Sequence, residues 1–508
     1  MNLAPPLSRR ATATVVLALL GLVLILQAPH LSRPPLDAHS FRQAQTQVTI
    51  ELFARDGIDL AHARTSYVGE PGVFVLELPI FQAACALLYQ WFGPHPEFVR
   101  SLNLLFTFAN AALVFMIGRR WFLSETALAG SVLFLLAPLN LTYMASTLID
   151  PSGVTCSLLV FLLAQRILHS AGGQRPVGVF GWVWFLVACV VTALIKTLYL
   201  FPTCVLLAAT LFQHRRLSGK LIGTGCGIAL GAGIFFIWLR HGRQINDASW
   251  FTRGVNPTVL LGFDPLLSAS FHITMIKRVL LHLAGPLAGM LAAWGAWSAL
   301  RGRDEQARSA RFAVAVMLLS VAGYWLMFAK VNFPHDYYSL VVLPYFCMAA
   351  GFGAGELARL ARARPLFARA AWLRPLTVGA LAGLLSIATF ARAKPLTPSP
   401  SLVELMQACA GRMDRWTYGM VFSTPSKGTA PSGSDAPGLL YATGLMGTGR
   451  VLENEAQVLA VWREQRPHYQ NLKYIVFYGL TPPAEILEQC GPVVLRDDAR
   501  QIFAYQLR

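Results

Sequence analysis

Long apolar segments recur along most of this 508-residue chain. A helix that crosses a lipid bilayer needs about 20 mainly apolar residues. Runs of this kind give eleven candidates, several with soft boundaries: roughly 11–29, 99–118, 123–143, 152–168, 178–195, 198–213, 220–239, 278–300, 312–330, 338–357 and 376–392. Because 55% of the residues are hydrophobic and 13% are charged, the composition is also that of an integral membrane protein.

The positive charges predict how these segments are oriented. The net charge of +17 could suggest a nucleic-acid partner, but the Lys and Arg residues lie between apolar segments, where they act as topology signals. Basic clusters near 9–10, 119–120, 166–175, 215–220, 301–311 and 359–374 all fall on one side. This alternation predicts a cytoplasmic amino terminus, an uncleaved first helix and, in a bacterium, insertion in the inner membrane.

The chain changes character after residue 392. A Pro-rich stretch, 394–400, reads as a stiff linker between a membrane domain (1–392) and a soluble domain (393–508). In the second domain we expect helices at 401–413 and 454–465, strands at 418–422 and 474–478, and a flexible loop at 424–438. The prediction is a small exoplasmic α/β domain. Cys409 and Cys490 would share an oxidising compartment and could pair.

A long loop, 30–98, follows the first apolar segment and opens with the polar stretch 37–47. Residues 43–55 have helical character with an apolar stripe of Val48, Leu52 and Phe53, which suggests a helix lying on the membrane surface. Residues 79–92 are apolar but too short to span, so we expect an interfacial or re-entrant segment.

Most of the acidic, histidine and amide clusters fall on the exoplasmic side of this topology. The candidate site residues are Asp37, His39, Arg42, Gln43, Glu70, Glu77, Asp150, Lys196, Arg240, Arg243, His335, Asp336 and Tyr338. Asp37 can cap the next helix or remove a proton from a hydroxyl group. Asp150, followed by a proline, can start a helix or contact a ligand.

Other candidates also have a structural alternative. Glu77 lies among apolar neighbours, so it either pairs with an Arg of the loop or faces a cavity. Lys196 interrupts an apolar run and either reaches to lipid headgroups or binds an anion. The tyrosine of the His335–Tyr338 turn can anchor at the interface. Exoplasmic cations, including Arg240 and Arg243, suggest an anionic ligand such as a lipid phosphate. No Cys/His spacing suggests zinc.

In their order and common face, these residues resemble the C-type (GT-C) glycosyltransferase superfamily, which includes the protein O-mannosyltransferases and the lipid A aminoarabinose transferase. The likeness covers roughly 1–350 and lies in Asp37, the Glu77-Leu78-Pro79 element, Asp150, Lys196 and the His335 to Tyr338 turn. Family members typically show further acids after the first span, where this chain reads Asp37-Ala38-His39.

The resemblance implies an all-α polytopic GT-C domain that uses a polyprenyl-phosphate sugar donor and a lipid, glycan or protein acceptor. Asp37 would be the general base of an inverting displacement, with Lys196, Arg42 and Arg240 or Arg243 facing the phosphate; a divalent metal is optional. The alternatives from the residues are a transporter or flippase for a lipid-linked saccharide, and an O-antigen ligase or polymerase. A flippase would more often show internal repeats, and none is visible here.

Overall fold

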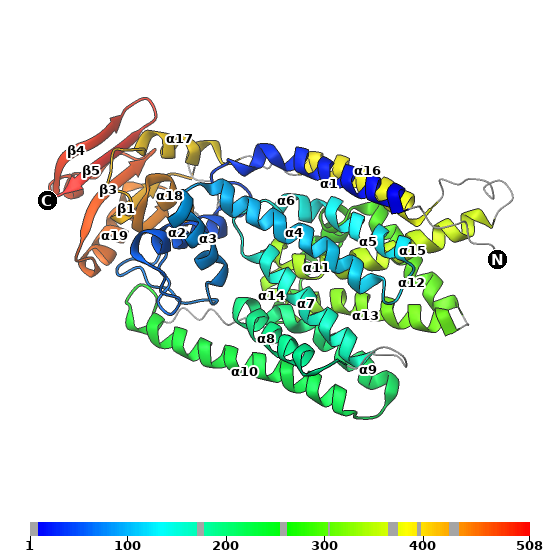
Figure 1. The fold of residues 1–508 in the computed structure, drawn as a ribbon. Helices are drawn as coiled ribbons and strands as arrows, with labels where there is room; N and C mark the ends of the chain where they lie inside the picture. The colour runs from blue at the N-terminus through cyan, green and yellow to red at the C-terminus, as the bar shows by residue number, and fades with distance from the viewer. Residues whose placement is uncertain are drawn as a thin grey trace.

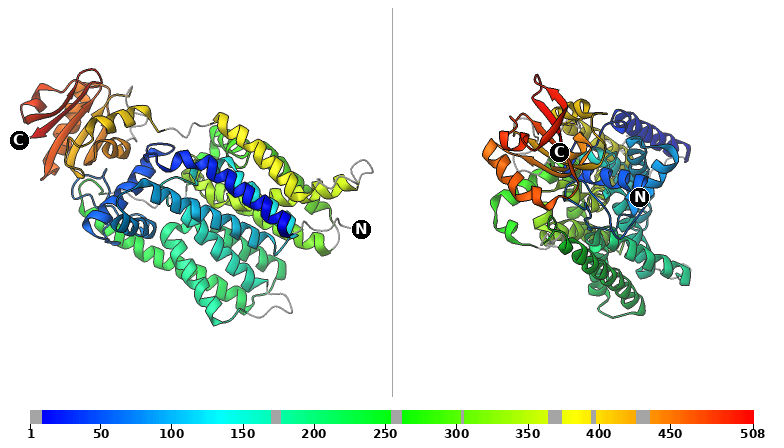
Figure 2. Two further views of the ribbon diagram at one scale, coloured as in Figure 1. Left: turned by 45° about the horizontal axis from the view of Figure 1, so that its top comes forward. Right: turned by 90° about the vertical axis from the view of Figure 1, so that its left-hand side faces the viewer.

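The computed structural model describes residues 9–169, 177–253, 262–302, 305–363, 374–393, 398–425 and 436–508. It consists of a bundle of long helices with a small β-sheet at one end (Figure 1). The amino terminus lies at the end of the bundle far from this sheet, and the carboxyl terminus lies within the sheet region. The left-hand view in Figure 2 shows the same separation.

The bundle is built from eleven long helices among the described residues. They are α1 (Arg9–Leu31), α4 (Pro96–Gly118), α5 (Ser124–Leu136), α7 (Asp150–Leu168), α8 (Val179–Lys196), α9 (Phe201–His214), α10 (Gly219–Ala248), α12 (Pro286–Arg301), α13 (Glu305–Met327), α15 (Leu343–Arg362) and α16 (Pro375–Ala393). Shorter helices α6 (Pro138–Tyr143), α11 (Ala269–Lys277) and α14 (Ala329–Asn332) connect them. A continuous apolar core runs through these helices.

The sequence predicts eleven spans, which is more than the number of described helices that are long and apolar enough to cross a membrane. Six helical segments of the described chain are long and apolar enough to cross a membrane, and seven if a bent pair counts as one span. One of the six, Val179–His214, contains both α8 and α9. That pair, Ala269–Leu283 and Pro286–Arg301, meets at 105°, where Pro286 interrupts the helix. The predicted segment 123–143 is likewise divided, because Pro138 separates α5 from α6. Helix α5 is therefore among the apolar helices that are shorter than a span.

The apolar stretch Val179–His214 reverses its direction at Lys196. Helices α8 and α10 run in the same direction. The evidence is that Gly223, Gly227 and Gly231 of α10 contact residues that come successively later in α8, namely Trp182, Phe185 and Cys189. Only residues 215–218 join the end of α9 to the start of α10, so α9 must return along α8. Lys196 is extended (φ −159°, ψ 104°) and a short 3-10 helix, η1 (Thr197–Leu200), completes the turn. The tight hairpin that was one expectation for this region is present.

Two helices lie within the long first loop, α2 (Ser40–Asp56) and α3 (Ile80–Phe92). Both were expected, but the surroundings of α2 differ from the prediction. Its residues from Gln43 to Ile50 are buried, and Val48 and Leu52 pack against the sheet region instead of facing lipid. Phe53 packs against α3 and α4. The apolar stripe therefore forms protein core.

The carboxyl-terminal region is a five-stranded sheet with the order β2-β1-β3-β5-β4. Its elements are α17 (Pro400–Cys409), β1 (Thr417–Ser423), α18 (Ala436–Thr443), β2 (Leu445–Val451), α19 (Glu455–Gln465), β3 (Leu472–Tyr478), α20 (Ala484–Leu487), β4 (Cys490–Asp497) and β5 (Ile502–Leu507). Strands β1, β2 and β3 are parallel, and β4 and β5 form an antiparallel pair beside β3. The predicted α/β class is confirmed. Most of the linker 394–400 and of the loop 424–438 lies outside the described residues.

The two faces of this sheet have separate cores. One core contains Cys409 together with α17, α18 and the buried face of α2. The other contains Cys490 and α19. Both cysteines are free and buried, so the pairing considered from the sequence is absent.

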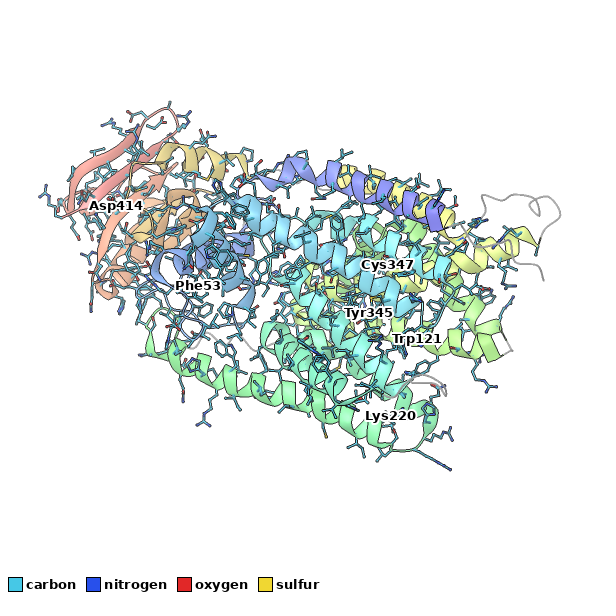
Figure 3. The ribbon with its side chains drawn as sticks, in the orientation of Figure 1. Phe53, Trp121, Lys220, Tyr345, Cys347 and Asp414 are labelled. Carbon is cyan, nitrogen blue, oxygen red and sulfur yellow. The ribbon has the colours of Figure 1, made fainter. Side chains whose placement is uncertain are left out.

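Two labelled charged residues lie at opposite ends of the molecule. Lys220, at the start of α10, lies at the end away from the sheet, whereas Asp414 lies beside the sheet (Figure 3).

Candidate functional site

A cavity of about 490 Å³ opens at the sheet end of the helical bundle. Its walls come from the start of α2, the coil between α2 and α3, the turn after α8, α10, and the segment around His335. The polar lining residues are Arg42, Tyr67, Glu77, Lys196, His335, Tyr337 and Tyr338. Its apolar lining includes Phe41, Phe74, Leu198, Phe235 and Leu239. Another cavity, of about 420 Å³ between α1, α4 and α5, has an almost wholly apolar lining and offers little to a reaction.

Arg42 and Glu77 form an ion pair in the wall of the cavity at the sheet end of the bundle. Arg42 Nη2 lies 2.5 Å from Glu77 Oε1, and Arg42 Nη1 donates to Gln45 Oε1 at 2.7 Å. Both side chains of the ion pair keep about a fifth of their surface exposed. Burial raises the pKa of Glu77, and the positive charges of Arg42 and Lys196 lower it. The lowering is the greater of the two effects, so the pKa of Glu77 lies below its ordinary value. Glu77 is thus a carboxylate that a ligand in the cavity can reach.

Lys196 and Asp150 form a second, more deeply buried ion pair. The Lys196 Nζ to Asp150 Oδ1 distance is 2.6 Å, and each side chain is less than 5% exposed. Tyr199 also donates its hydroxyl to Asp150, at 2.5 Å. The Lys196 ammonium lies over the rings of Tyr338 and Tyr337, 4.4 and 5.2 Å from their centroids. Lys196 lines the cavity, whereas Asp150 lies behind it and anchors the lysine.

Asp37 lies just before α2 and is held by two donors. Both terminal nitrogens of Arg100 are 3.3 Å from Asp37 Oδ2, and the Gln43 amide donates to Oδ1. Arg100 is only 1% exposed and Asp37 6%. The amide oxygen of Gln43 accepts the backbone N–H of Thr147 at 3.0 Å. The Asp37 carboxylate is therefore fixed in direction and is nearly enclosed.

His39 and Asp336 form a further contact next to the cavity. His39 Nε2 lies 2.9 Å from Asp336 Oδ1, which also accepts the Tyr143 hydroxyl at 2.6 Å. The His39 ring is 5.0 Å from that of Tyr337 and 5.9 Å from that of His335. Burial, followed by the positive charges of His39, Arg42 and Lys196, lowers the pKa of His335 to about 4. His335 is therefore neutral near pH 7.

Eight of the thirteen predicted residues are not among those that line the cavity. Five of them, Asp37, His39, Gln43, Asp150 and Asp336, make the contacts described above outside the lining, and the other three are Glu70, Arg240 and Arg243. Arg240 and Arg243 are exposed on α10, although Leu239 of the same helix does line it. Glu70 accepts hydrogen bonds from residues 470 and 471 of the carboxyl-terminal region. Among the described residues, no group of three or more His, Cys, Asp or Glu side chains could hold a metal ion.

Sequence reasoning also missed three residues of the site. Arg100 could have been found from the sequence, because a charge at the start of an apolar span is costly unless it has a partner. Tyr67 and Tyr143 carried no such signal, since tyrosine is common at membrane interfaces. Their positions in the site follow only from the fold.

The helical bundle and the sheet at one end define the class of fold, which is similar to that of the GT-C glycosyltransferases ArnT and AglB. No protein-family model matches the sequence, and no curated protein does so. ArnT from Cupriavidus metallidurans in the apo state is similar over 98% of both chains, with a TM-score of 0.63 and 13% sequence identity. The same protein bound to undecaprenyl phosphate matches 98% of both chains with a TM-score of 0.62 and 14% identity.

A third solved structure with the same fold is archaeal. The oligosaccharyltransferase AglB from Archaeoglobus fulgidus, in complex with an inhibitory peptide and a dolichol-phosphate, matches 91% of this chain and 69% of its own. The TM-score is 0.53 and the identity 11%. At these identities the likeness establishes the fold, and the GT-C resemblance seen in the sequence is confirmed at that level.

Proposed function

We propose that this protein is an inverting glycosyltransferase that moves a sugar from a polyprenyl-phosphate donor to a hydroxyl acceptor at the periplasmic face of the bacterial inner membrane. The observation that carries the proposal is the cavity, where Arg42, Lys196 and three tyrosines meet at one end of an apolar helical bundle. Cations and hydroxyl groups are suitable ligands for a phosphate, and the apolar helices suit a long lipid tail.

The solved structures support a donor of this class. ArnT was solved with undecaprenyl phosphate, and AglB with a dolichol-phosphate. The two ligands share a polyprenyl chain and a phosphate. The sugar and the acceptor, which can be lipid A, another glycan or a protein, are left to experiment.

A phosphate in this cavity has to compete with carboxylates that are already present. Glu77 is bound to Arg42, and Asp150 is bound to Lys196. Glu77 lies in a coil segment and is partly exposed, so its side chain can turn away with little change elsewhere. Asp150 is enclosed and stays with Lys196. We therefore expect the phosphate to displace Glu77 from Arg42 and to approach Lys196 from the open side.

The reaction is a single displacement at the anomeric carbon. The acceptor oxygen forms the new bond to that carbon while the bond to the phosphate oxygen breaks, and the electron pair leaves with the lipid phosphate. The proton of the acceptor hydroxyl passes to a carboxylate, for which we assign Asp37. Arg42 and Lys196 offset the charge that develops on the phosphate. His39, Gln43 and Asp336 would contact the sugar or the acceptor; a divalent metal is optional.

The direct test is transfer of a labelled sugar from polyprenyl phosphate by the purified protein in proteoliposomes. Lipid, glycan and protein fractions of a bacterial envelope serve as acceptors. We expect labelled product with inverted anomeric configuration. Activity only with diphosphate-linked oligosaccharides would favour a ligase or polymerase, and movement of intact donor between leaflets without transfer would favour a flippase.

A further inference from the structure

We propose that Glu70 is a positioning residue through which the carboxyl-terminal region holds one wall of the cavity in place. The wall segment is residues 65–78, which contribute Tyr67, Phe74, Leu76 and Glu77 to the lining. Glu70 lies in the same segment but faces away from the cavity, toward the sheet region. The inference gives that region a part in the site, and it rests on the proposed function only where donor binding is concerned.

The Glu70 carboxylate accepts three hydrogen bonds from the segment that connects α19 to β3. Its Oε2 accepts the backbone N–H groups of Gln470 at 2.8 Å and Asn471 at 3.0 Å. Its Oε1 accepts the side-chain amide of Asn471. A carboxylate that accepts several N–H groups forms stronger hydrogen bonds than a neutral acceptor does. This one residue therefore links the wall segment to a part of the chain 400 positions later.

Backbone contacts beside Glu70 show that the wall segment and the sheet region fit closely. Gly447 of β2 donates its N–H to the Ser66 carbonyl at 2.6 Å and accepts the Gly69 N–H at 3.3 Å. Gly69 has φ +69°, and the ring of Phe251 occupies the place where a Cβ atom would lie. The Phe251 ring in turn lies 4.8 Å from that of Tyr469.

The other end of the wall segment is fastened to α10 instead. The Asn246 side chain bonds both the N–H and the carbonyl of Val75, each at 3.0 Å. Trp238 Nε1 donates to the Leu76 carbonyl at 2.9 Å. Because α10 holds residues 75 and 76 and the carboxyl-terminal region holds residues 66–70, Phe74 lies between two anchors and Tyr67 lies within the second one. Release of the Glu70 anchor should free Tyr67 while leaving Glu77 near Arg42.

The test combines hydrogen exchange with donor binding in the full-length protein in nanodiscs. We compare Glu70→Ala, the near-isosteric Glu70→Gln and the control Glu485→Ala. Glu485 also forms a charged contact on the surface of the sheet region, with Arg463, but it is remote from the wall segment. We expect Glu70→Ala to speed amide exchange within 65–74 by about tenfold, with little change in 75–78. Glu70→Gln, which can still accept the backbone N–H groups, should restore most of the protection.

Binding of polyprenyl phosphate is the second measurement. Glu70→Ala should weaken it by about tenfold, and in the transfer reaction it should raise KM for the donor with kcat nearly unchanged. Unchanged exchange within 65–74 in Glu70→Ala would overturn the proposal, as would faster exchange with unaltered lipid binding. If the wild-type protein binds no polyprenyl phosphate, the proposed function fails, and the exchange data still decide whether Glu70 holds the wall.

Discussion

At the scale of single residues, the site is a set of charges that are already paired before any substrate arrives. Asp37 shows this most clearly, because Arg100 and Gln43 bind its two carboxylate oxygens separately. The sequence suggested Asp37 as a base, and the structure adds the two groups that fix its direction. A carboxylate that is held in this way keeps one orientation before any substrate arrives.

The first prediction concerns this carboxylate. Asp37→Asn keeps the shape and the Arg100 contact but removes the proton acceptor, so kcat for sugar transfer should fall by about 10²- to 10⁴-fold. Radiolabel transfer in proteoliposomes measures it. Asp59→Asn, an exposed aspartate of the same loop, is the matched control. Full turnover in Asp37→Asn together with loss in Glu77→Gln would move the role of base to Glu77.

The second prediction separates stability from function at Lys196. Lys196→Met leaves Asp150 buried without its cation, which should lower the free energy of unfolding by about 3–5 kcal/mol. Combining it with Asp150→Leu removes both charges and should restore much of the melting temperature in detergent. The double variant should still bind polyprenyl phosphate poorly, because the cation is missing. Normal lipid binding by the stable double variant would exclude Lys196 as a phosphate ligand.

The third prediction concerns pH and His335. Its pKa is about 4 in the folded protein, below the ordinary value of 6.5, so the unfolded chain binds more protons between these values. Stability should therefore rise with pH from about 4 to 6.5 and stay level above that range as far as this group is concerned. Melting temperatures across this range, compared with those of His335→Asn, measure the contribution. An equally steep pH dependence in the variant would contradict it.

At the scale of elements, glycines decide how closely two helices of the bundle approach. Gly231 of α10 lies against the backbone of α8, where an added Cβ atom would be 2.8 Å from the Cys189 carbonyl oxygen. Gly233, two residues later, has no atom within 4 Å of the corresponding position. Small residues allow close helix contacts inside a membrane, where helix packing replaces the hydrophobic effect as the driving force.

The fourth prediction uses this contrast. Gly231→Val should force α8 and α10 apart and lower the melting temperature in detergent by several degrees, since overpacking costs about 1–3 kcal/mol. Gly233→Val, with the same change of size and propensity, should behave almost like the wild type. Equal losses in the two variants would mean that helix propensity, and not the contact, is responsible.

Helices and strands could be predicted from the sequence where one hydrophobic pattern covered the whole element. Strands β1 and β3 were expected because their buried residues form continuous apolar runs. Strand β2 was missed, since Gly447 and Gly449 interrupt its pattern, and β4 was missed because Pro492 and exposed residues mark it as an edge strand. The span count failed for a different reason: apolar composition does not reveal the bend at Pro286 or the break at Pro138.

The site was predictable only in part, for reasons that lie at the same scale. Topology placed Arg42, Glu77, Lys196 and His335 on one face, and all four line the cavity. It could not show that Arg240 and Arg243 point away from the cavity, because both faces of α10 lie at the same height in the membrane. The Glu70 contacts join residues 400 apart in the chain, and no local pattern records such a pairing.

At the scale of the whole molecule, the division at residue 393 is less complete than the sequence indicates. Ala44, Val48 and Leu52 of α2 belong to the same core as Leu402, Leu405 and Val476. The Ser399 N–H also donates to the Leu36 carbonyl at 3.0 Å. The first loop and the carboxyl-terminal region therefore share one packed core at the sheet end of the bundle.

The fifth prediction follows from the two faces of the sheet. Cys409 and Cys490 lie in cores on opposite sides of the sheet, so no disulfide should form between them. Alkylation of the denatured protein without reductant should label both thiols, and mass spectrometry reads this directly. Reducing agents should leave the melting temperature unchanged. A linked peptide containing both residues would contradict the arrangement.

The shared core of α2 also sets an order of events during biosynthesis. Helix α2 leaves the ribosome early, yet the residues that cover its apolar face are made more than 350 positions later. During all of that synthesis the polar stretch that carries Asp37 and Arg42 has no completed support. The buried face of α2 and the wall segment 65–78 therefore gain their full support only when the last strands have been made and folded. A ribosome that stops early releases a chain whose helical bundle is complete but whose wall segment is not held in place.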